Sequence, residues 1–306
     1  MPLSLFMKAG RVKFAPASAS PVIAGTALAL AMGNKFDPLL FTLALLGIIF
    51  IHIASNMFND YFDHLSGNDW YNQNYTDFSG GSRTIQLGMV SPKSVLMTAI
   101  LCTAIGSLAG IVILYLTKSL FILTLALAGV SGAYFYSARP FKFAYRGFGE
   151  ILIFFLFGVA PVYGAYFLQS KTIDAAPAIT SIMIGLLIFT LLVINEIPDR
   201  VADEKAKKKT LVVQLGVKNT ILLVRVSLVC VYLAAIVGLV FLPYMRIACA
   251  LALLTIPLAL KLSKLLTEEQ IQKPNNSIHS ELIVKLHSMV SIALTLGFLS
   301  HRLFNN

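Results

Sequence analysis

Long runs of apolar residues dominate the chain, and polar residues gather in short stretches between them. Nine of these runs are about 20 residues long, which is the length a helix needs to cross the hydrocarbon core of a bilayer. The pattern predicts an all-α polytopic membrane bundle. The nine predicted spans cover approximately residues 14–33, 38–60, 92–116, 119–137, 148–168, 176–197, 219–241, 244–266 and 282–302.

Short polar connections separate several of these spans. The segments 33–37 and 117–119 leave room only for tight turns, so the helices that they join are expected to be antiparallel neighbours. Composition agrees with a membrane protein, because 57% of the residues are hydrophobic and only 12% are charged, against about 25% charged in soluble domains. We therefore expect one transmembrane domain, covering residues 1–306.

The basic residues are distributed unevenly between the two sets of loops. A net charge of +10 could suggest nucleic acid, but 18 of the 24 Lys and Arg lie in the N-terminus and in the loops after even-numbered spans, and five lie on the opposite side. The positive-inside rule explains this bias, and no nucleic-acid partner is expected. It predicts a multi-pass protein of the cell inner membrane, with the N-terminus and these loops in the cytoplasm and the C-terminus outside.

Two polar stretches at the cytoplasmic ends of spans contain the same residue types at helical spacing. The asparagines and aspartates in question are Asn56, Asp60 and Asp63 in the first stretch and Asn195, Asp199 and Asp203 in the second. Each set falls on one face of a continuing helix. Carboxylate and amide oxygens suit Mg²⁺, and two such ions bridging a diphosphate would neutralise the cluster. The alternative is that these acids form salt bridges at the membrane surface.

Basic residues in the same loops are candidate ligands for phosphate oxygens. These candidates are Arg83, Arg139, Lys142, Arg146 and Lys208. An arginine can pair with a phosphate group through two hydrogen bonds. The alternative for each of these five residues is a surface charge that sets the topology of the chain in the membrane. Arg83 and Lys142 are favoured because Gly or aromatic residues surround them near the membrane edge. Aromatic residues close to the acidic stretches include Tyr136, and aromatic faces can stabilise a developing cation.

The two acidic stretches resemble the aspartate-rich motifs of the UbiA superfamily of intramembrane prenyltransferases. The first motif corresponds to 59–63 followed by Asp69, and the second to 195–203 followed by the Lys-Lys-Thr-Leu segment that begins at Lys208. Gly67 stands where the superfamily most often has a further Asp, and Asp69 takes its place. The segments 80–83 and 145–150 are most similar to the MenA branch, which prenylates 1,4-dihydroxy-2-naphthoate.

The resemblance implies a nine-helix bundle around a central cavity, in which two Mg²⁺ ions bind the diphosphate of a polyprenyl donor. The residues implied as metal ligands are Asp60, Asp63, Asp69, Asp199, Asp203 and Asn56. The catalytic candidates are Asn56, Asp60, Asp63, Asp199 and Asp203. The candidate substrate contacts are the five basic residues named above together with Asn59, Asn195 and Tyr136. Ionisation of the donor gives an allylic carbocation, which an aromatic acceptor attacks on the way to menaquinone.

Two rival interpretations remain open at this point. The same chemistry could act on 4-hydroxybenzoate, homogentisate or a glycerol-phosphate lipid. A secondary transporter or cation channel could instead use the acids as an ion path, but such acids are expected near mid-span. Here they lie at the ends of spans, which favours the enzyme.

Overall fold

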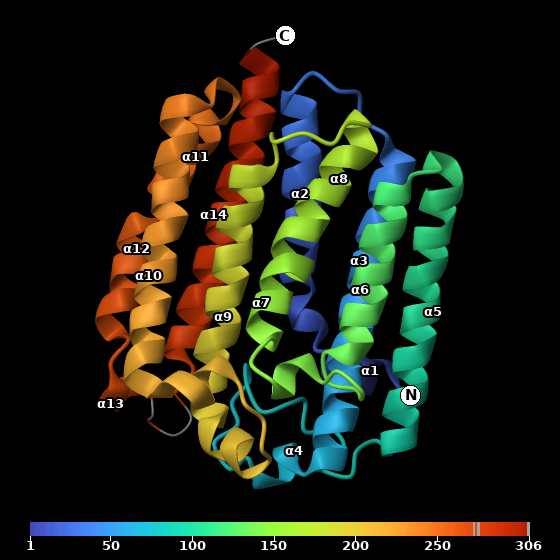
Figure 1. The fold of residues 1–306 in the computed structure, drawn as a ribbon, viewed down its shortest axis with the longest axis vertical. Coiled ribbons are helices and arrows are strands. Elements are labelled where there is room, and N and C mark those ends of the chain that lie inside the picture. The colour runs from blue at the N-terminus through green and yellow to red at the C-terminus, as the bar shows by residue number, and fades with distance from the viewer. Residues whose placement is uncertain (272, 274–275, 305–306) are drawn as a thin grey trace.

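A computed structural model describes residues 1–271, 273 and 276–304. Within these ranges the chain is helical and contains no strand, as Figure 1 shows. The long helices are α2 (Ala15–Ala31), α3 (Pro38–Ser66), α5 (Pro92–Thr117), α6 (Leu120–Phe135), α9 (Ala178–Lys205), α10 (Leu211–Phe241) and α14 (Ile278–Phe304). The shorter helical segments are α1 (Leu3–Ala9), η1 (Val12–Phe14), α4 (Asn68–Tyr71), η2 (Phe143–Tyr145), α7 (Gly149–Ile153), η3 (Phe154–Val159), α8 (Ala160–Ser170), η4 (Pro243–Met245), α11 (Arg246–Leu253), α12 (Ile256–Leu265) and α13 (Glu268–Ile271).

Each of the nine predicted spans is occupied by helix, although not all are of spanning length. Seven continuous helical segments in the described chain are long and apolar enough to cross a membrane. An eighth crossing is possible if Pro243–Leu253 and Ile256–Leu265, which meet at a bend of 46°, form one span. The remaining prediction corresponds to α6, which is apolar but has only 16 residues. The prediction of a polytopic helical bundle is confirmed, and nine is an approximate count.

The fifth span is one continuous rod made of three helical segments of two types. It begins as α7, continues through a π-helical turn, η3, and ends as α8. A side chain added at Gly158 of η3 would place its Cβ 2.2 Å from the Cα of Gly185, so η3 and α9 pack backbone against backbone. Small residues commonly permit such close approach between membrane helices. This close contact fixes the position of α9, which forms one wall of the cavity described below.

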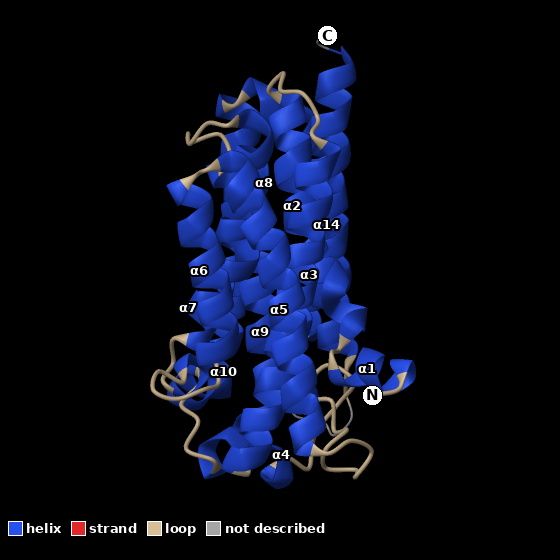
Figure 2. Ribbon diagram, turned by 90° about the vertical axis from the view of Figure 1, so that its right-hand side faces the viewer, coloured by secondary structure: helices blue, strands red, loops and turns tan. Residues whose placement is uncertain are grey.

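Both helices that carry the acidic stretches extend beyond their apolar runs. Helix α3 continues to Ser66 and stops at Gly67, whose φ of 82° is readily adopted only without a side chain. Helix α9 continues to Lys205, past Asp203. The acids therefore lie on helix ends, as the spacing predicted. Figure 2 shows loops gathered at the two ends of the rod-like bundle, with α4 at one of these ends. Helix α4 contacts both α3 and α9.

Candidate functional site

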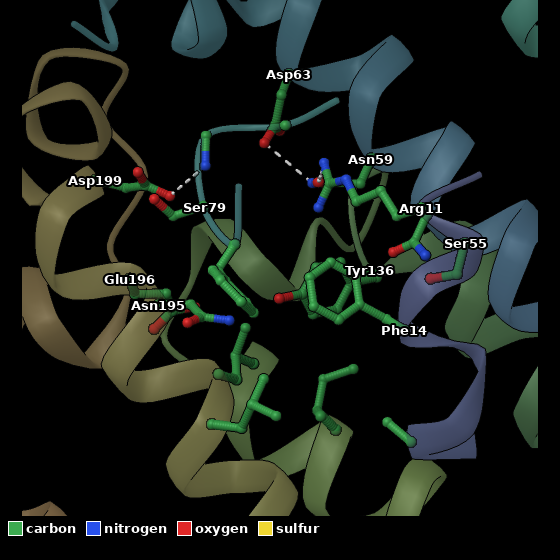
Figure 3. Close-up of a pocket in the computed structure, with 18 of the residues that line it drawn as sticks. Arg11, Phe14, Ser55, Asn59, Asp63, Ser79, Tyr136, Asn195, Glu196 and Asp199 are labelled. Atoms are coloured by element: carbon green, nitrogen blue, oxygen red, sulfur yellow. Dashed lines mark hydrogen bonds between the residues drawn. The ribbon is translucent and has the colours of Figure 1, made fainter. Parts of the chain in front are cut away.

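A cavity of about 170 Å³ lies between the acidic ends of α3 and α9. Its walls come from η1 and α2, α3, the loop that follows α4, η3 and α9. Figure 3 shows Asp63 and Arg11 on one side and Asp199, Glu196 and Asn195 on the other. The cavity floor is apolar and includes Ile153, Phe157 and Leu191. Residues of both acidic stretches therefore line one cavity.

Asp60 is buried and is held by a cation from the N-terminal segment. The Nη2 atom of Arg11 lies 2.5 Å from Asp60 Oδ1 and 3.3 Å from Asn59 Oδ1. The backbone N–H of Ser82 donates to both carboxylate oxygens, at 3.2 and 3.3 Å. These contacts compensate the carboxylate for its loss of water, since a buried charge requires partners.

Asp63, one helical turn further, has the largest set of partners. The Tyr145 hydroxyl donates to Oδ1 at 2.7 Å, and Lys208 Nζ lies 3.2 Å from Oδ2. Asn59 and Asn68 donate to the same Oδ2 atom at 3.0 and 3.4 Å. Asp63 therefore connects α3 to the segment before α7 and to the segment after α9.

Asp199 on α9 is anchored by the loop that follows α4. The Asn72 side chain donates to Asp199 Oδ1 at 2.7 Å, and the backbone N–H of Gly80 donates to Oδ2 at 3.0 Å. Positive φ angles of 75° and 78° at Gly80 and Gly81 shape this loop. A Cβ at Gly81 would lie 3.0 Å from Asp69 Oδ2, so the backbone approaches the acids closely because no side chain intervenes.

Asp203 is the acid with the fewest partners. It is 1% exposed, and neither of its carboxylate oxygens has a hydrogen-bond partner in the described part of the chain. Its nearest cation is Lys208, whose Nζ lies 3.7 Å from Oδ1. Burial alone would lower the pKa of Lys208, but the carboxylates of Asp203 and Asp63 raise it well above its ordinary value. Lys208 thus remains charged between acids that belong to two different helices.

Asp69 lies on α4, beneath the glycine loop. Gln86 donates to its Oδ2 atom at 3.0 Å, and Arg83 donates to its backbone carbonyl. Burial, reinforced by the neighbouring charges of Asp63 and Asp60, raises the pKa of the Asp69 carboxyl to about 8. A bound cation would favour the ionised form instead, so this carboxyl is suited to a site that gains positive charge.

The predicted amide and aromatic residues line the same cavity. Asn56, Asn59, Asn195 and Tyr136 all contribute to its wall. Asn56 donates to the Gly10 carbonyl at 3.1 Å, which ties α3 to the N-terminal segment. The Oδ1 atom of Asn195 is buried and has no hydrogen-bond partner within the described residues. It is therefore an oxygen available to a ligand.

The predicted basic residues are placed differently from one another. Lys208 lines the cavity, and Arg83 lies beside it with its guanidinium 4.4 Å from the Tyr75 ring centre. Lys142 Nζ lies 4.3 Å from the ring centre of Tyr145, outside the cavity wall. Arg139 and Arg146 are exposed and do not line the cavity. The structure brings Lys208 and Arg83 to the acids and leaves the other three further out.

Several residues at the site were not predicted. Arg11 had the same sequence signal as Lys8 and Lys13, namely a basic residue before the first span. Tyr145 was one aromatic among many near the membrane edge, and Glu196 was not distinguished from the acids around it. The backbone donors at Gly80 and Ser82 carry no residue-type signal at all. The Gly-Gly pair was the one visible sign that the loop approaches something closely.

The donor set fits a hard divalent cation that is completed by a ligand. No three His, Cys, Asp or Glu side chains of the described chain converge into a preformed metal cluster. Mg²⁺ does not need one, since it keeps several waters and commonly binds one or two carboxylates together with substrate phosphates. Both oxygens of Asp203 and the Oδ1 atoms of Asn195 and Asn68 are buried and find no hydrogen-bond partner among the residues that the structure describes. They are oxygen donors of the type that Mg²⁺ prefers.

Residues 18–283 match the model of the UbiA prenyltransferase family. The chain belongs to this family. It is 32% identical to a 1,4-dihydroxy-2-naphthoate octaprenyltransferase of Bacillus subtilis, over 73% of this chain and 70% of that one. The protein of the same name from Mycobacterium tuberculosis is 30% identical over 84% of each chain. The expected similarity to the MenA branch is thereby confirmed.

A solved UbiA homologue shares the fold. The structure of the Archaeoglobus fulgidus protein bound to GPP and Mg²⁺ superposes with a TM-score of 0.69, at 16% identity, over 96% of this chain and 99% of that one. At this identity the likeness concerns the helical arrangement. The protein described here is therefore a multi-pass membrane protein of the UbiA prenyltransferase fold.

Proposed function

We propose that the protein transfers a polyprenyl group from its diphosphate to an aromatic acceptor, 1,4-dihydroxy-2-naphthoate, with Mg²⁺ as cofactor. The observation that carries the proposal is the shared lysine: Lys208 pairs with Asp63 of the first motif and with Asp203 of the second. Acids from both motifs thus meet at one lysine, which lines the cavity together with Asp63 and Asp199. The names of the bacterial relatives support the acceptor, and the Mg²⁺ and GPP bound by the archaeal homologue support the cofactor and the donor class.

The two motifs would hold the cation through Asp60, Asp63, Asp69, Asp199 and Asp203, with Asn56 and Asn195 nearby. We propose two ions, because one divalent cation at each motif would offset the negative charge of the carboxylates there. When bound, Mg²⁺ supplies positive charge that stabilises the diphosphate as it leaves. In the structure, protein cations occupy that electrostatic role: Arg11 pairs with Asp60, and Lys208 lies between Asp63 and Asp203.

The chain's own residues then account for the remaining steps. Lys208 and Arg83 would turn from the carboxylates and the Asp69 carbonyl toward phosphate oxygens, where their charge opposes the charge that develops on the leaving group. Arg139, Lys142 and Arg146 lie farther out and would act on the arriving donor through long-range attraction. The face of Tyr136, in the cavity wall, would stabilise the allylic cation.

The acceptor ring would attack the allylic carbon over the apolar floor of the cavity, after the C–O bond to the diphosphate has broken. The attacked ring carbon would then lose its carboxylate as CO2, and the electron pair of that bond would restore the aromatic ring. Ile153, Phe157 and Leu191 exclude water there, which protects the cation from hydrolysis. The site lies at the end of the bundle that carries the N-terminus and the basic loops. We propose that this end faces the cytoplasm across the inner membrane, and that the whole chain forms one domain.

A transfer assay on purified protein tests the proposal. Protein in detergent would be given geranylgeranyl diphosphate, Mg²⁺ and, separately, 1,4-dihydroxy-2-naphthoate, 4-hydroxybenzoate, homogentisate or a glycerol phosphate. We expect prenylated product with the naphthoate, and none when EDTA removes the metal. Product with a different acceptor alone would reject the proposed acceptor while retaining the reaction class. Prenyl transfer that is unchanged in EDTA would reject the metal.

A further inference from the structure

His52 is a buried polar side chain in the cavity wall that takes no part in holding the metal or the diphosphate. It lies on α3, and its ring meets the ring of Phe157 edge to face, with centroids 5.0 Å apart. Phe157 belongs to the apolar floor, so His52 stands where the floor meets the polar part of the cavity. An ionisable residue inside a membrane helix is costly and is usually kept for a function.

A hydrogen bond from α2 decides which ring nitrogen of His52 carries the hydrogen. Ser18 Oγ lies 2.6 Å from His52 Nδ1. Ser18 is fully buried, and within the described residues this is the one hydrogen bond of its side chain. If Nδ1 carried a hydrogen, the hydroxyl hydrogen of Ser18 would have no acceptor, which is costly for a buried group. Ser18 therefore donates to Nδ1, and the neutral ring carries its hydrogen on Nε2.

The Nε2–H group of His52 has no hydrogen-bond partner among the described residues. Because His52 lines the cavity, this donor is available to a ligand that enters it. A polar group inside a membrane bundle loses free energy when it stays unpaired, and a ligand oxygen that accepts from it recovers that loss on binding. His52 thus favours a ligand that carries an oxygen at this level of the cavity.

The donor substrate does not supply that oxygen. Asp60 lies eight residues beyond His52 on the continuous helix α3, which corresponds to about 12 Å along the helix axis, and Asp63 lies further still. The diphosphate therefore belongs near the end of α3, and the isoprenoid tail has no hydrogen-bond acceptor. The aromatic acceptor remains, since it carries hydroxyl oxygens and would lie over the floor to which Phe157 contributes.

We propose that His52 donates a hydrogen bond from Nε2 to a hydroxyl oxygen of the aromatic acceptor, and that Ser18 holds the imidazole in the tautomer that permits this. The inference rests on the proposed function and deepens it, because it names residues that select the acceptor. His52 is then a binding residue for the acceptor, and Ser18 is a positioning residue that acts through it. The ligand class is an aromatic ring with oxygen substituents.

The substitution His52→Leu tests the contact, with His287→Leu as its matched control. His287 is also a buried histidine within a long apolar helix, α14, and it does not line the cavity. The measured quantity is Kd for 1,4-dihydroxy-2-naphthoate, 1-hydroxy-2-naphthoate and 4-hydroxy-2-naphthoate. It is determined by equilibrium dialysis of the full chain in detergent, with Mg²⁺ and inorganic diphosphate present.

We expect wild type to bind the diol about ten-fold more tightly than one of the two mono-hydroxy compounds, because the compound that lacks the contacted oxygen leaves Nε2–H unpaired. This preference should disappear in His52→Leu and persist in His287→Leu. KM for geranylgeranyl diphosphate should stay as in wild type in both variants, since His52 lies away from the diphosphate.

Two further variants distinguish a hydrogen bond from cavity shape, and they also decide the matter if His52→Leu does not fold. The side-chain amide of Gln places an N–H group near the position of Nε2, so His52→Gln should keep most of the preference for the diol. Ser18→Ala removes the group that fixes the tautomer, so the preference should fall by roughly three-fold without direct contact between residue 18 and the acceptor.

A preference for the diol that survives in His52→Leu, or that falls equally in His287→Leu, would overturn the contact. An equal loss of affinity for all three naphthoates in His52→Leu would overturn it too, because the side chain would then only shape the cavity. So would a wild-type protein that binds none of them. Because binding needs no turnover, the expected preference without any prenyl transfer would reject the proposed function and leave the contact standing. Prenyl transfer with an unchanged preference in His52→Leu would reject the contact alone.

Discussion

The Tyr145 hydroxyl donates a 2.7 Å hydrogen bond to Asp63, from a segment 82 residues later in the chain. The same hydroxyl lies 2.6 Å from Ser66 Oγ, at the end of α3. Tyr145 therefore fixes the orientation of an acid that also faces Lys208. A tyrosine in this position holds the carboxylate without neutralising it, and so keeps it available to a cation.

Replacing Tyr145 by phenylalanine is expected to impair cation binding more than folding. Loss of a hydrogen bond to a charged group costs about 1.5–3 kcal/mol, equivalent to roughly ten-fold or more in the Mg²⁺ concentration needed for half-maximal transfer. Tyr166→Phe is the matched control, since its hydroxyl donates to Asp174 at 3.1 Å, away from the cavity. Equal Mg²⁺ requirements in the two variants would contradict the role given to Tyr145.

Asp203→Asn is expected to impair transfer strongly without destabilising the protein. Within the described residues neither oxygen of Asp203 has a hydrogen-bond partner, and its ion pair with Lys208 is long, at 3.7 Å. We therefore expect the neutral amide of Asn, which has a similar shape, to be tolerated in the fold. We expect kcat/KM to fall about a hundred-fold, or roughly 3 kcal/mol of transition-state stabilisation. The melting temperature in detergent should stay within about 2 °C of wild type. Retention of full activity would remove Asp203 from the metal site.

The variants Lys208→Gln and Lys209→Gln compare the loss of a lysine at the site with the loss of a lysine on the surface. Lys208 contacts both motifs, whereas its neighbour Lys209 has an exposed side chain. We expect KM for the donor diphosphate to rise by roughly ten-fold or more in Lys208→Gln, because one charge-assisted contact to phosphate is lost. Lys209→Gln should resemble wild type. The proposed contact fails the test if both variants bind the donor as wild type does.

Gly81→Ala tests the close approach of the loop to the acids. Gly81 and Gly88 both have positive φ, 78° and 68°, so alanine strains the backbone at either position by about 1–2 kcal/mol. A Cβ at Gly81 meets Asp69 and Asp60, whereas a Cβ at Gly88 meets nothing within 4 Å. Transfer activity should therefore fall in Gly81→Ala and persist in Gly88→Ala. Similar activities would mean that crowding of the carboxylates is unimportant.

The helical bundle and the two acidic helix ends follow directly from sequence pattern. Apolar run length predicts spans, and the spacing of Asn56, Asp60 and Asp63 places them on one face whatever the rest of the chain does. The short α6 and the bent pair α11–α12 show the limit of this reasoning. Hydropathy reports that a segment is apolar, but packing decides where its helix bends or stops.

The partners of the acids were harder to foresee, because they depend on loop conformation. Arg11, Lys208 and Arg146 are all basic residues next to spans, yet the first two turn inward and Arg146 donates to the exposed Pro140 carbonyl instead. Sequence alone gives no direction for a side chain on an irregular segment. The donors at Gly80 and Ser82 are backbone groups, which every residue except proline possesses.

These two backbone donors lie only two residues apart and hold acids of different motifs. Ser82 binds Asp60 on α3, and Gly80 binds Asp199 on α9. The separation of the two acids is thereby limited by a stretch of main chain that spans at most about 7 Å. Main-chain length therefore sets how far apart the carboxylates of the two motifs can stand, and this spacing does not depend on the identity of any loop side chain that donates to them.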